Sequence, residues 1–209
     1  MKKMMKRYCL YLFILIGISC SAELKAQKNG TVYKGNDPAV RYTGRTLVSS
    51  DGSVAFDWVG TYLETRFTGG KLSVKVSETG TSYYNVFVDG KLHKVVKVCG
   101  TDTLIHLVSG IDKRIHSLKI QKRSEGEFGK TTVHQFVLSG SGRLAEELAV
   151  RTRHIEFIGN SLTCGYGTDG KHRDEPFLVE TENCNLTFAS MVARYYDADY
   201  TLIAHSGRG

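Results

Sequence analysis

Proline, cysteine and long apolar runs are all scarce in this 209-residue sequence, and each scarcity excludes a class of protein. With 2 Pro, 22 Gly and 41% hydrophobic residues, the composition is near the globular average and unlike that of collagen-like or disordered chains. The 5 Cys form no Cys-x-x-Cys pair and no Cys/His spacing typical of zinc, which argues against a disulfide-dense scaffold and a structural metal. A chain of this length can bury a sizeable core, as one large domain or two small ones.

The formal net charge of +7 is concentrated in the first 26 residues. These hold five cations and one acid, so 23 of the 28 Lys and Arg and 20 of the 21 Asp and Glu lie beyond them. The remainder therefore carries only +3. A nucleic-acid partner, which a pI of about 9.1 suggests at first sight, loses its main support, and we expect none.

The amino-terminal segment has the layout of a secretory signal peptide. A basic stretch at 1–7 precedes an apolar run of 11 residues at 8–18, too short to span a bilayer as a helix. We expect cleavage after Ala26, which makes residues 1–26 the signal peptide. The alternative is a bacterial lipoprotein box ending at Cys20, although Gly17 stands where Leu is usual. Either ending predicts export, to the periplasm, to the medium or as an outer-membrane lipoprotein, with no transmembrane span in the mature chain.

Cleavage after Ala26 would leave three cysteines, Cys99, Cys164 and Cys184. Because three is odd, at most one internal disulfide forms and one thiol is left over. We expect buried or half-buried thiols without redox chemistry.

Residues 29–145 alternate apolar and polar positions in short segments, the pattern of half-buried β-strands. Turn residues separate these segments at spacings of about ten. Asp89-Gly90 stands between two of them and is a strong signal for a two-residue hairpin. We therefore predict an all-β domain over 29–145, a β-sandwich or jelly roll, with no helix. The expected strands are 54–58, 63–67, 72–76, 84–88, 91–98, 104–107, 117–122 and 132–138, followed by a short bridge at 143–150.

Residues 150–209 change to a strand–helix–strand pattern. Apolar strands at 154–158 and 200–204 flank a helical pattern that starts at Asn185, with Asn183 or Asn185 as its cap. Such a unit is parallel with a right-handed crossover, so both strands end at the same edge of the sheet. One helix for two strands cannot close a core, so we expect the start of an α/β domain, incomplete within this chain. The alternative is that Gly209 is a true end and the unit packs on the β-domain.

The first strand runs into a serine on a glycine-flanked turn, Gly159-Asn160-Ser161, and the second into Ser206-Gly207. Because parallel neighbours lie about 4.8 Å apart, the two turns should flank one crevice at the edge where α/β sheets bind ligands. A hydroxyl on such a turn is exposed, and nearby backbone N–H groups can face a developing oxyanion. The structural alternative is that Ser161 only caps a helix and the glycines only make turns. The pattern is not the Gly-x-Ser-x-Gly elbow of α/β-hydrolases.

The stretch Ile-Gly-Asn-Ser-Leu-Thr-Cys-Gly-Tyr-Gly at 158–167 resembles the first block of the SGNH (GDSL-type) hydrolases, and above all carbohydrate esterase family 2. The terminal Ser-Gly-Arg-Gly at 206–209 and the order of features between also match that family, over residues 30–209. The resemblance implies a jelly roll followed by a three-layer α/β SGNH domain, and O-deacetylation of plant polysaccharides such as xylan or mannan. It implies Ser161 as nucleophile and oxyanion N–H, Gly207 as a second oxyanion N–H, turn support from Gly159 and Asn160, and no metal or organic cofactor.

Two departures from the family pattern bear on activity. Asn160 replaces the usual Asp of the serine block, which we expect to have modest consequences because Asn still accepts and donates hydrogen bonds. The family's third oxyanion donor, an Asn, and its catalytic His fall in later blocks that this chain does not contain. His205 is the nearest substitute base, and structural packing or substrate contact is the more natural role for it. Without a base a serine hydroxyl is a poor nucleophile, so we expect this chain by itself to have little esterase activity.

Two other functions fit parts of the sequence. The β-domain is a common carbohydrate-binding scaffold, on which aromatics such as Trp58, Tyr83 or Tyr84 could stack on sugars. A degenerate hydrolase that kept the serine turn and lost its base is the second. Both leave an acetylated plant polysaccharide or oligosaccharide as the expected partner.

Overall fold

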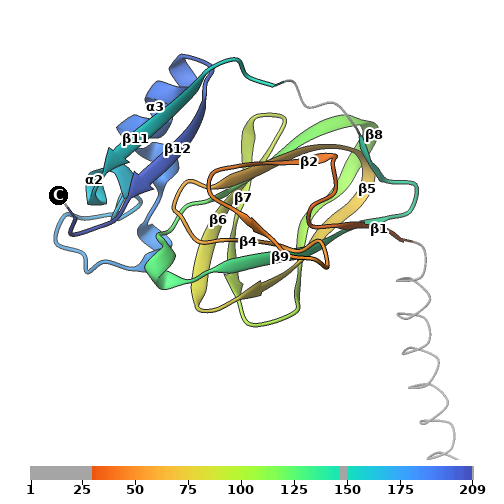
Figure 1. Cartoon of the computed structure of the whole chain (residues 1–209), viewed down its shortest axis with the longest axis horizontal. Helices are drawn as coiled ribbons and strands as arrows, with labels where there is room; N and C mark the ends of the chain where they lie inside the picture. Colours follow the sequence, from red (N-terminus) through yellow and green to blue (C-terminus); the bar gives the residue numbers. More distant parts are fainter. Residues whose placement is uncertain (1–29, 146–149, 209) are drawn as a thin grey trace, which may run out of the picture.

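The computed structural model describes residues 30–145 and 150–208, and within them a β-sandwich carries a smaller α/β unit at one end (Figure 1). The sandwich is built from one ten-stranded antiparallel sheet that folds over on itself. Its strands are β1 (Gly30–Lys34), β2 (Val40–Thr43), β3 (Leu47–Val48), β4 (Val54–Phe56), β5 (Tyr62–Glu78), β6 (Thr81–Val88), β7 (Lys91–Cys99), β8 (Thr103–Lys122), β9 (Thr131–Ser139) and β10 (Arg143–Ala145). The central order is β3-β4-β9-β5-β8-β6-β7, with β1 beside β9 and with β2 and β10 beside β5. The predicted β-sandwich is confirmed.

The fold-over is made by β5 and β8, which are longer than the sequence predicts. Strands expected at 63–67 and 72–76 are one continuous β5, and those at 104–107 and 117–122 are one β8. The pairing of β5 with β8 shifts register around Gly70, and Gly69 and Gly70 both have positive φ. Before this bend β5 pairs with β2, and after it with β9, so one strand serves both layers.

The hairpin turn predicted at Asp89-Gly90 is confirmed. Asp89 and Gly90, with φ of 50° and 75°, form the tight turn between β6 and β7. Two expectations are wrong. The stretch 143–150 is not only a bridge, because β10 pairs with β5, and the β8–β9 connection includes a 3₁₀ turn, η2 (Gly126–Phe128). The core between the layers is apolar, with Phe67, Leu72, Phe136 and Leu138 all 0% exposed.

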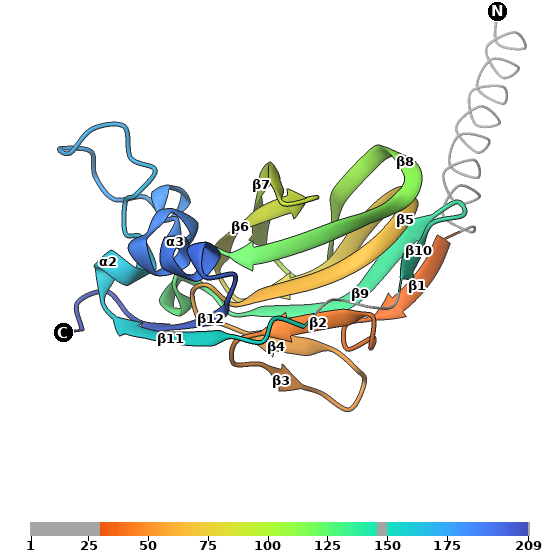
Figure 2. The ribbon, with the colours of Figure 1, turned by 90° about the horizontal axis from the view of Figure 1, so that it is seen from above.

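The α/β unit consists of two parallel strands with helical segments packed on one face (Figure 2). Its elements are β11 (His154–Gly159), α2 (Ser161–Cys164), η3 (Val179–Thr181), η4 (Cys184–Leu186), α3 (Phe188–Tyr195) and β12 (Asp199–Ala204). The helix predicted from Asn185 is divided: η4, capped by the Asn183 side chain through the N–H of Asn185 at 3.2 Å, precedes α3, which begins at Phe188. The parallel β–α–β geometry brings the carboxyl ends of β11 and β12 to one edge, with Gly159 opposite Ala204.

The sandwich and the α/β unit share a second hydrophobic cluster. It contains Val59 and Tyr62 from the sandwich together with Tyr200 and Leu202 of β12. The contact is close: a Cβ on Gly60 would lie 2.6 Å from Leu202. Burial against β12 explains why the first part of β5 is buried on both faces.

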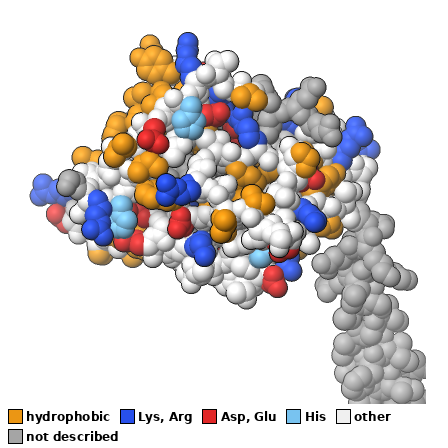
Figure 3. All heavy atoms as spheres, in the orientation of Figure 1, with side chains coloured by type: hydrophobic (Ala, Val, Ile, Leu, Met, Phe, Trp, Pro, Cys, Tyr) orange, Lys and Arg blue, Asp and Glu red, His pale blue; other side chains and the backbone are white. Residues whose placement is uncertain are grey.

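The opposite side of the α/β unit leaves large apolar side chains exposed, among them Ile158 (80%), Leu162 (76%) and Tyr195 (83%). Figure 3 shows hydrophobic side chains gathered over the region of α3 and β11. In residues 30–145 and 150–208, no helix is both long and apolar enough to cross a membrane. The expected signal peptide, residues 1–26, and Cys20 lie outside the described residues.

Candidate active site

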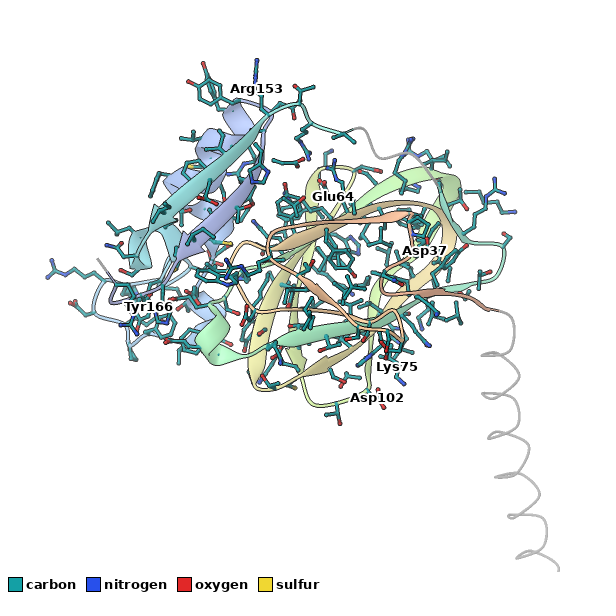
Figure 4. The ribbon with its side chains drawn as sticks, viewed as in Figure 1. Asp37, Glu64, Lys75, Asp102, Arg153 and Tyr166 are labelled. Atoms are coloured by element: carbon teal, nitrogen blue, oxygen red, sulfur yellow. The ribbon has the colours of Figure 1, made fainter. Side chains whose placement is uncertain are left out.

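The serine turn and the glycine turn lie at the same edge of the β11–β12 pair. Gly159 and Ala204 are register partners, and the N–H of His205 donates to the Gly159 carbonyl at 3.3 Å. Ser161 follows Gly159 by two positions, and Gly207 follows Ala204 by three. Figure 4 labels Tyr166 at this carboxyl edge and Arg153 at the opposite end of β11. The parallel pairing thus places the two turns together, as the sequence predicts.

The serine turn is held by short-range contacts. Asn160 caps α2, its side-chain oxygen accepting from the N–H of Leu162 at 3.2 Å. A Cβ on Gly159 would lie 2.1 Å from Thr163 Oγ1, so only glycine fits where the strand meets the helix. Ser161 is the first residue of α2 and is half-buried. The N–H groups of a first helical turn have no partner within the helix, which leaves the Ser161 N–H available as a donor.

The end of α2 packs tightly on the segment that leads to η4. Gly165 has a φ of 82°, and a Cβ there would lie 2.5 Å from the Asn183 carbonyl oxygen. The Gly165 carbonyl in turn accepts from the N–H of Asn183 at 2.9 Å. Gly165 therefore meets two demands, a left-handed backbone and a close approach of two chains.

The glycine turn after β12 is exposed but anchored. Gly207 has a φ of 73° and no atom within 4 Å of where a Cβ would be. The residue before it, Ser206, donates its backbone N–H to Glu125 of the sandwich at 2.6 Å, and its hydroxyl donates to the same carboxyl group. A cavity of about 250 Å³ beside this turn is lined by Trp58, Glu127 and His205 among others.

Arg123, at the end of β8, holds the long connection between α2 and η4. Its side chain is 3% exposed, and its Nε donates to the Glu182 carbonyl at 2.7 Å. One Nη donates to the Glu180 carbonyl at 3.0 Å and forms an ion pair with Asp169. A planar guanidinium is the cation suited to several acceptors at once. Arg123 thus anchors the connection between α2 and η4 to the sandwich, next to the serine turn.

Aromatic side chains follow the same connection. The rings of Tyr166 and Phe177 stack with centroids 3.6 Å apart, and Phe128 of η2 lies 5.6 Å from Phe177. Tyr166 is 47% exposed. The suggestion that Tyr84 stacks on sugars is wrong, because its side chain is buried in the sandwich core. The other two aromatics considered for this role, Trp58 and Tyr83, are half-buried.

No side chain in residues 30–145 and 150–208 hydrogen-bonds to the hydroxyl of Ser161. His205 lies beside the glycine turn, with Nδ1 3.7 Å from Glu125 and Nε2 3.5 Å from Glu127. His154 opens β11, at the far end of the strand, and bonds to Thr201. His172 is exposed in the connection after α2. His205 and His154 thus contact other groups, and none of these three histidines bonds to the Ser161 hydroxyl.

The three cysteines of the described part are all free thiols. Cys164 and Cys184 are buried, as expected, and Cys99 is exposed, contrary to expectation, at the end of β7. What sequence reasoning missed entirely is a buried pair of acids, Glu125 and Glu182, 1% and 0% exposed, that adjoins Cys164. Glu182 lies in the stretch 181–183, which matches the family's order of features, but nothing in the sequence indicates its pairing with Glu125, and buried acids run against the usual composition of a core.

Comparison with protein families and known proteins points in one direction. A family model described as carbohydrate esterase 2 N-terminal matches residues 42–147. A cellulase/esterase, CelE, of Acetivibrio thermocellus is 33% identical over 174 residues, which cover 83% of this chain and 21% of that protein. An acetylxylan esterase / glucomannan deacetylase of Cellvibrio japonicus is 31% identical over 174 residues, covering 79% of this chain and 47% of that protein.

Solved structures agree with the sequence comparisons. The structure of a family two carbohydrate esterase from Clostridium thermocellum in complex with cellohexaose has a TM-score of 0.78 and 33% identity to this chain. The match covers 81% of this chain and 52% of that one. The chain thus spans about half the length of that structure and a fifth to a half of the two curated relatives.

Proposed function

This chain belongs to carbohydrate esterase family 2, and we propose that it supplies the nucleophile and two oxyanion donors of an exported serine esterase that removes O-acetyl groups from plant polysaccharides. The substrates we propose are acetylated xylan and mannan-type glycans. Two domains underlie this proposal, the sandwich of 29–145 and an SGNH-type α/β domain that starts at 150.

The observation that carries the proposal is the meeting of two turns at one strand edge. The Gly159–Ala204 register supports a role for Ser161 as nucleophile beside the Gly207 turn. Ser161 Oγ attacks the acetyl carbonyl carbon, and the carbonyl oxygen becomes an oxyanion that the N–H groups of Ser161 and Gly207 stabilise. Collapse of this intermediate releases the sugar hydroxyl and leaves an acetyl-serine, which water hydrolyses to acetate. Removal of one such donor typically costs about 10²–10³ in rate.

The general base in this proposal comes from outside residues 30–208. The Ser161 hydroxyl has no side-chain partner in the described part, and the Nδ1 atom of His205 is hydrogen-bonded to the Ser206 carbonyl at 2.7 Å. The exposed apolar side chains of β11, α2 and α3 support further packing on this unit. A His on an element that covers this face would take the Ser161 proton and return it to the leaving sugar oxygen.

The experiment is acetate release from acetylated xylan and glucomannan by the full gene product, comparing wild type with Ser161→Ala. The control is Ser141→Ala, the same substitution at an exposed serine in the β9–β10 turn. We expect Ser161→Ala to abolish acetate release while the unfolding midpoint and the Ser141→Ala activity stay at wild-type values. Unchanged turnover in Ser161→Ala would refute the nucleophile. Glycan binding without acetate release by the wild type would favour the alternative, a non-catalytic carbohydrate-binding module.

Export is a separate part of the proposal, supported by the basic stretch and apolar run at 1–18. Amino-terminal sequencing of the mature protein should begin at Gln27 for signal peptide cleavage. A lipid-modified Cys20 at the amino terminus would establish the lipoprotein alternative. An intact Met1 on the mature protein would contradict export by this signal.

A further inference from the structure

A carboxyl group from the sandwich holds the turn that carries Gly207. Glu125 follows β8, and its side chain is 1% exposed. One of its oxygens accepts from the Ser206 N–H at 2.6 Å, and the other accepts from the Ser206 hydroxyl. Ser206 immediately precedes Gly207, so Glu125 fixes the peptide next to the proposed oxyanion donor.

A second buried carboxyl group faces the first. Glu182 is 0% exposed, and its Oε2 accepts from the backbone N–H of Glu125 at 2.9 Å. Its Oε1 is buried without a donor among the residues the structure describes. A buried acceptor that lacks a donor is costly, and two ionised carboxylates so close together repel. A proton on Oε1 removes both costs, because Glu182 then donates to Glu125.

The electrostatics agree with this geometry. Burial raises the pKa of Glu182 to about 9, and its side-chain hydrogen bond to Glu125 adds to the rise. Burial also lowers the pKa of Lys122, whose ammonium donates to the Ser82 hydroxyl, to about 8. Glu182 and Lys122 therefore both titrate in the alkaline range. The charged and titratable groups that face the pair are Lys122 and Arg123 of the β8 end, Asp57 before Val59, Cys164 of α2, Cys184 of η4, and His205 with Glu127 at the glycine turn.

A bound cation is the other way to hold two acids and a thiol together. Glu125, Glu182 and Cys164 each offer one ligand atom, all within 4.8 Å of one another. However, such a cation would take the Cys164 sulfur as its third ligand. Burial is the main cause that raises the pKa of the Cys164 thiol, and the nearby Glu125 carboxyl adds to the rise. This raised pKa disfavours the thiolate that a metal ion would need as a ligand. A shared proton accounts for the arrangement with the groups already in place.

We propose that Glu125 is a positioning residue for the Gly207 oxyanion turn, and that a proton held on Glu182 keeps Glu125 in place. This inference rests on the proposed function, because it takes the Gly207 N–H as an oxyanion donor. It implies that the esterase site depends on Glu125, a side chain of the sandwich. The Gly207 turn is no longer held in place when Glu125 and Glu182 are both ionised.

The activity test compares two isosteric variants in the full gene product. Glu125→Gln places an amide where Ser206 needs two acceptor oxygens, so we expect kcat to fall about 10²-fold with KM little changed. Glu182→Gln mimics the protonated acid, so kcat at neutral pH should stay near the wild-type value and the alkaline loss of kcat should disappear. Asp102→Asn, at an exposed acid in the turn between β7 and β8, controls for the loss of one negative charge away from the glycine turn. A wild-type kcat in Glu125→Gln, or an unchanged alkaline limb in Glu182→Gln, would overturn the proposal.

A second measurement does not depend on catalysis. The backbone amide NMR signals of Ser206 and Gly207 are followed in the wild type from about pH 6 to about pH 10. We expect both to shift with a midpoint near 9, the pKa of Glu182, and to stay fixed in Glu182→Gln. Signals that do not move in the wild type would refute the shared proton, as would a stoichiometric metal in the purified protein. If Ser161→Ala left acetate release unchanged while these shifts appeared, the proposed function would fail and the coupling between Glu182 and the turn would stand.

Discussion

Gly165 and Gly167 offer a matched pair of substitutions that tests how the serine turn is held. Both have positive φ, 82° and 68°, so alanine at either position should cost about 1–2 kcal/mol for the left-handed backbone. Only at Gly165 would the added Cβ meet another chain segment, at 2.5 Å from the Asn183 carbonyl oxygen, whereas at Gly167 nothing lies within 4 Å. Such overpacking adds about 1–3 kcal/mol. We expect Gly165→Ala to destabilise by about 2–5 kcal/mol in total and Gly167→Ala by the backbone cost alone.

Urea unfolding measures the difference between the two variants. With an m-value of about 2 kcal/mol/M, the extra cost at Gly165 lowers the midpoint by about 1 M relative to Gly167→Ala. Hydrogen exchange at 159–166 locates the effect, and these amides should exchange faster in Gly165→Ala only. Equal midpoints and equal exchange in the two variants would refute the close approach of α2 to Asn183.

Two further predictions concern the contacts around this turn. Arg123→Lys keeps the charge but loses the planar guanidinium that binds the Glu182 and Glu180 carbonyls. It should therefore destabilise the protein by about 1–3 kcal/mol and speed amide hydrogen exchange over 169–183. Exchange at the wild-type rate over these residues would show that Arg123 does not hold this connection. Among the three cysteines of the described part, only Cys99 is exposed, so a thiol reagent should label one of the three in the native protein and all three after unfolding. Native labelling of Cys164 or Cys184 at the rate of Cys99 would show that their burial is wrong.

The parts of the fold that sequence predicts are those with a local physical cause. Asp89-Gly90 requires two positive φ values in succession, and the structure has them at 50° and 75°. The parallel pairing of β11 with β12 follows from the helical crossover connection between them. Cys99 shows that residue type alone does not predict burial. Thiols are usually buried, but Cys99 lies exposed at the end of β7.

Two parts of the fold differ from the sequence prediction, for different physical reasons. Gly69-Gly70 has the composition of a turn, but the β5 backbone continues through it as a bend because β8 and β9 supply hydrogen-bond partners on both sides. The helix expected from Asn185 begins at Phe188, because Asn183 stabilises a separate 3₁₀ turn before it. In the first case tertiary pairing overrides a local turn signal. In the second, a local cap divides the helical segment.

The residues that follow β8 connect the sandwich to both turns of the candidate active site. Arg123 binds the connection that follows the serine turn, and two residues later Glu125 binds the turn before Gly207. Both side chains are almost fully buried, so neither contact forms unless the sandwich and the α/β unit are packed together. Tyr62 adds a third link, its hydroxyl donating to Asp199 at the start of β12 at 2.7 Å. An α/β unit separated from the sandwich would lose the groups that fix both turns, because each of those groups comes from the other half of the chain.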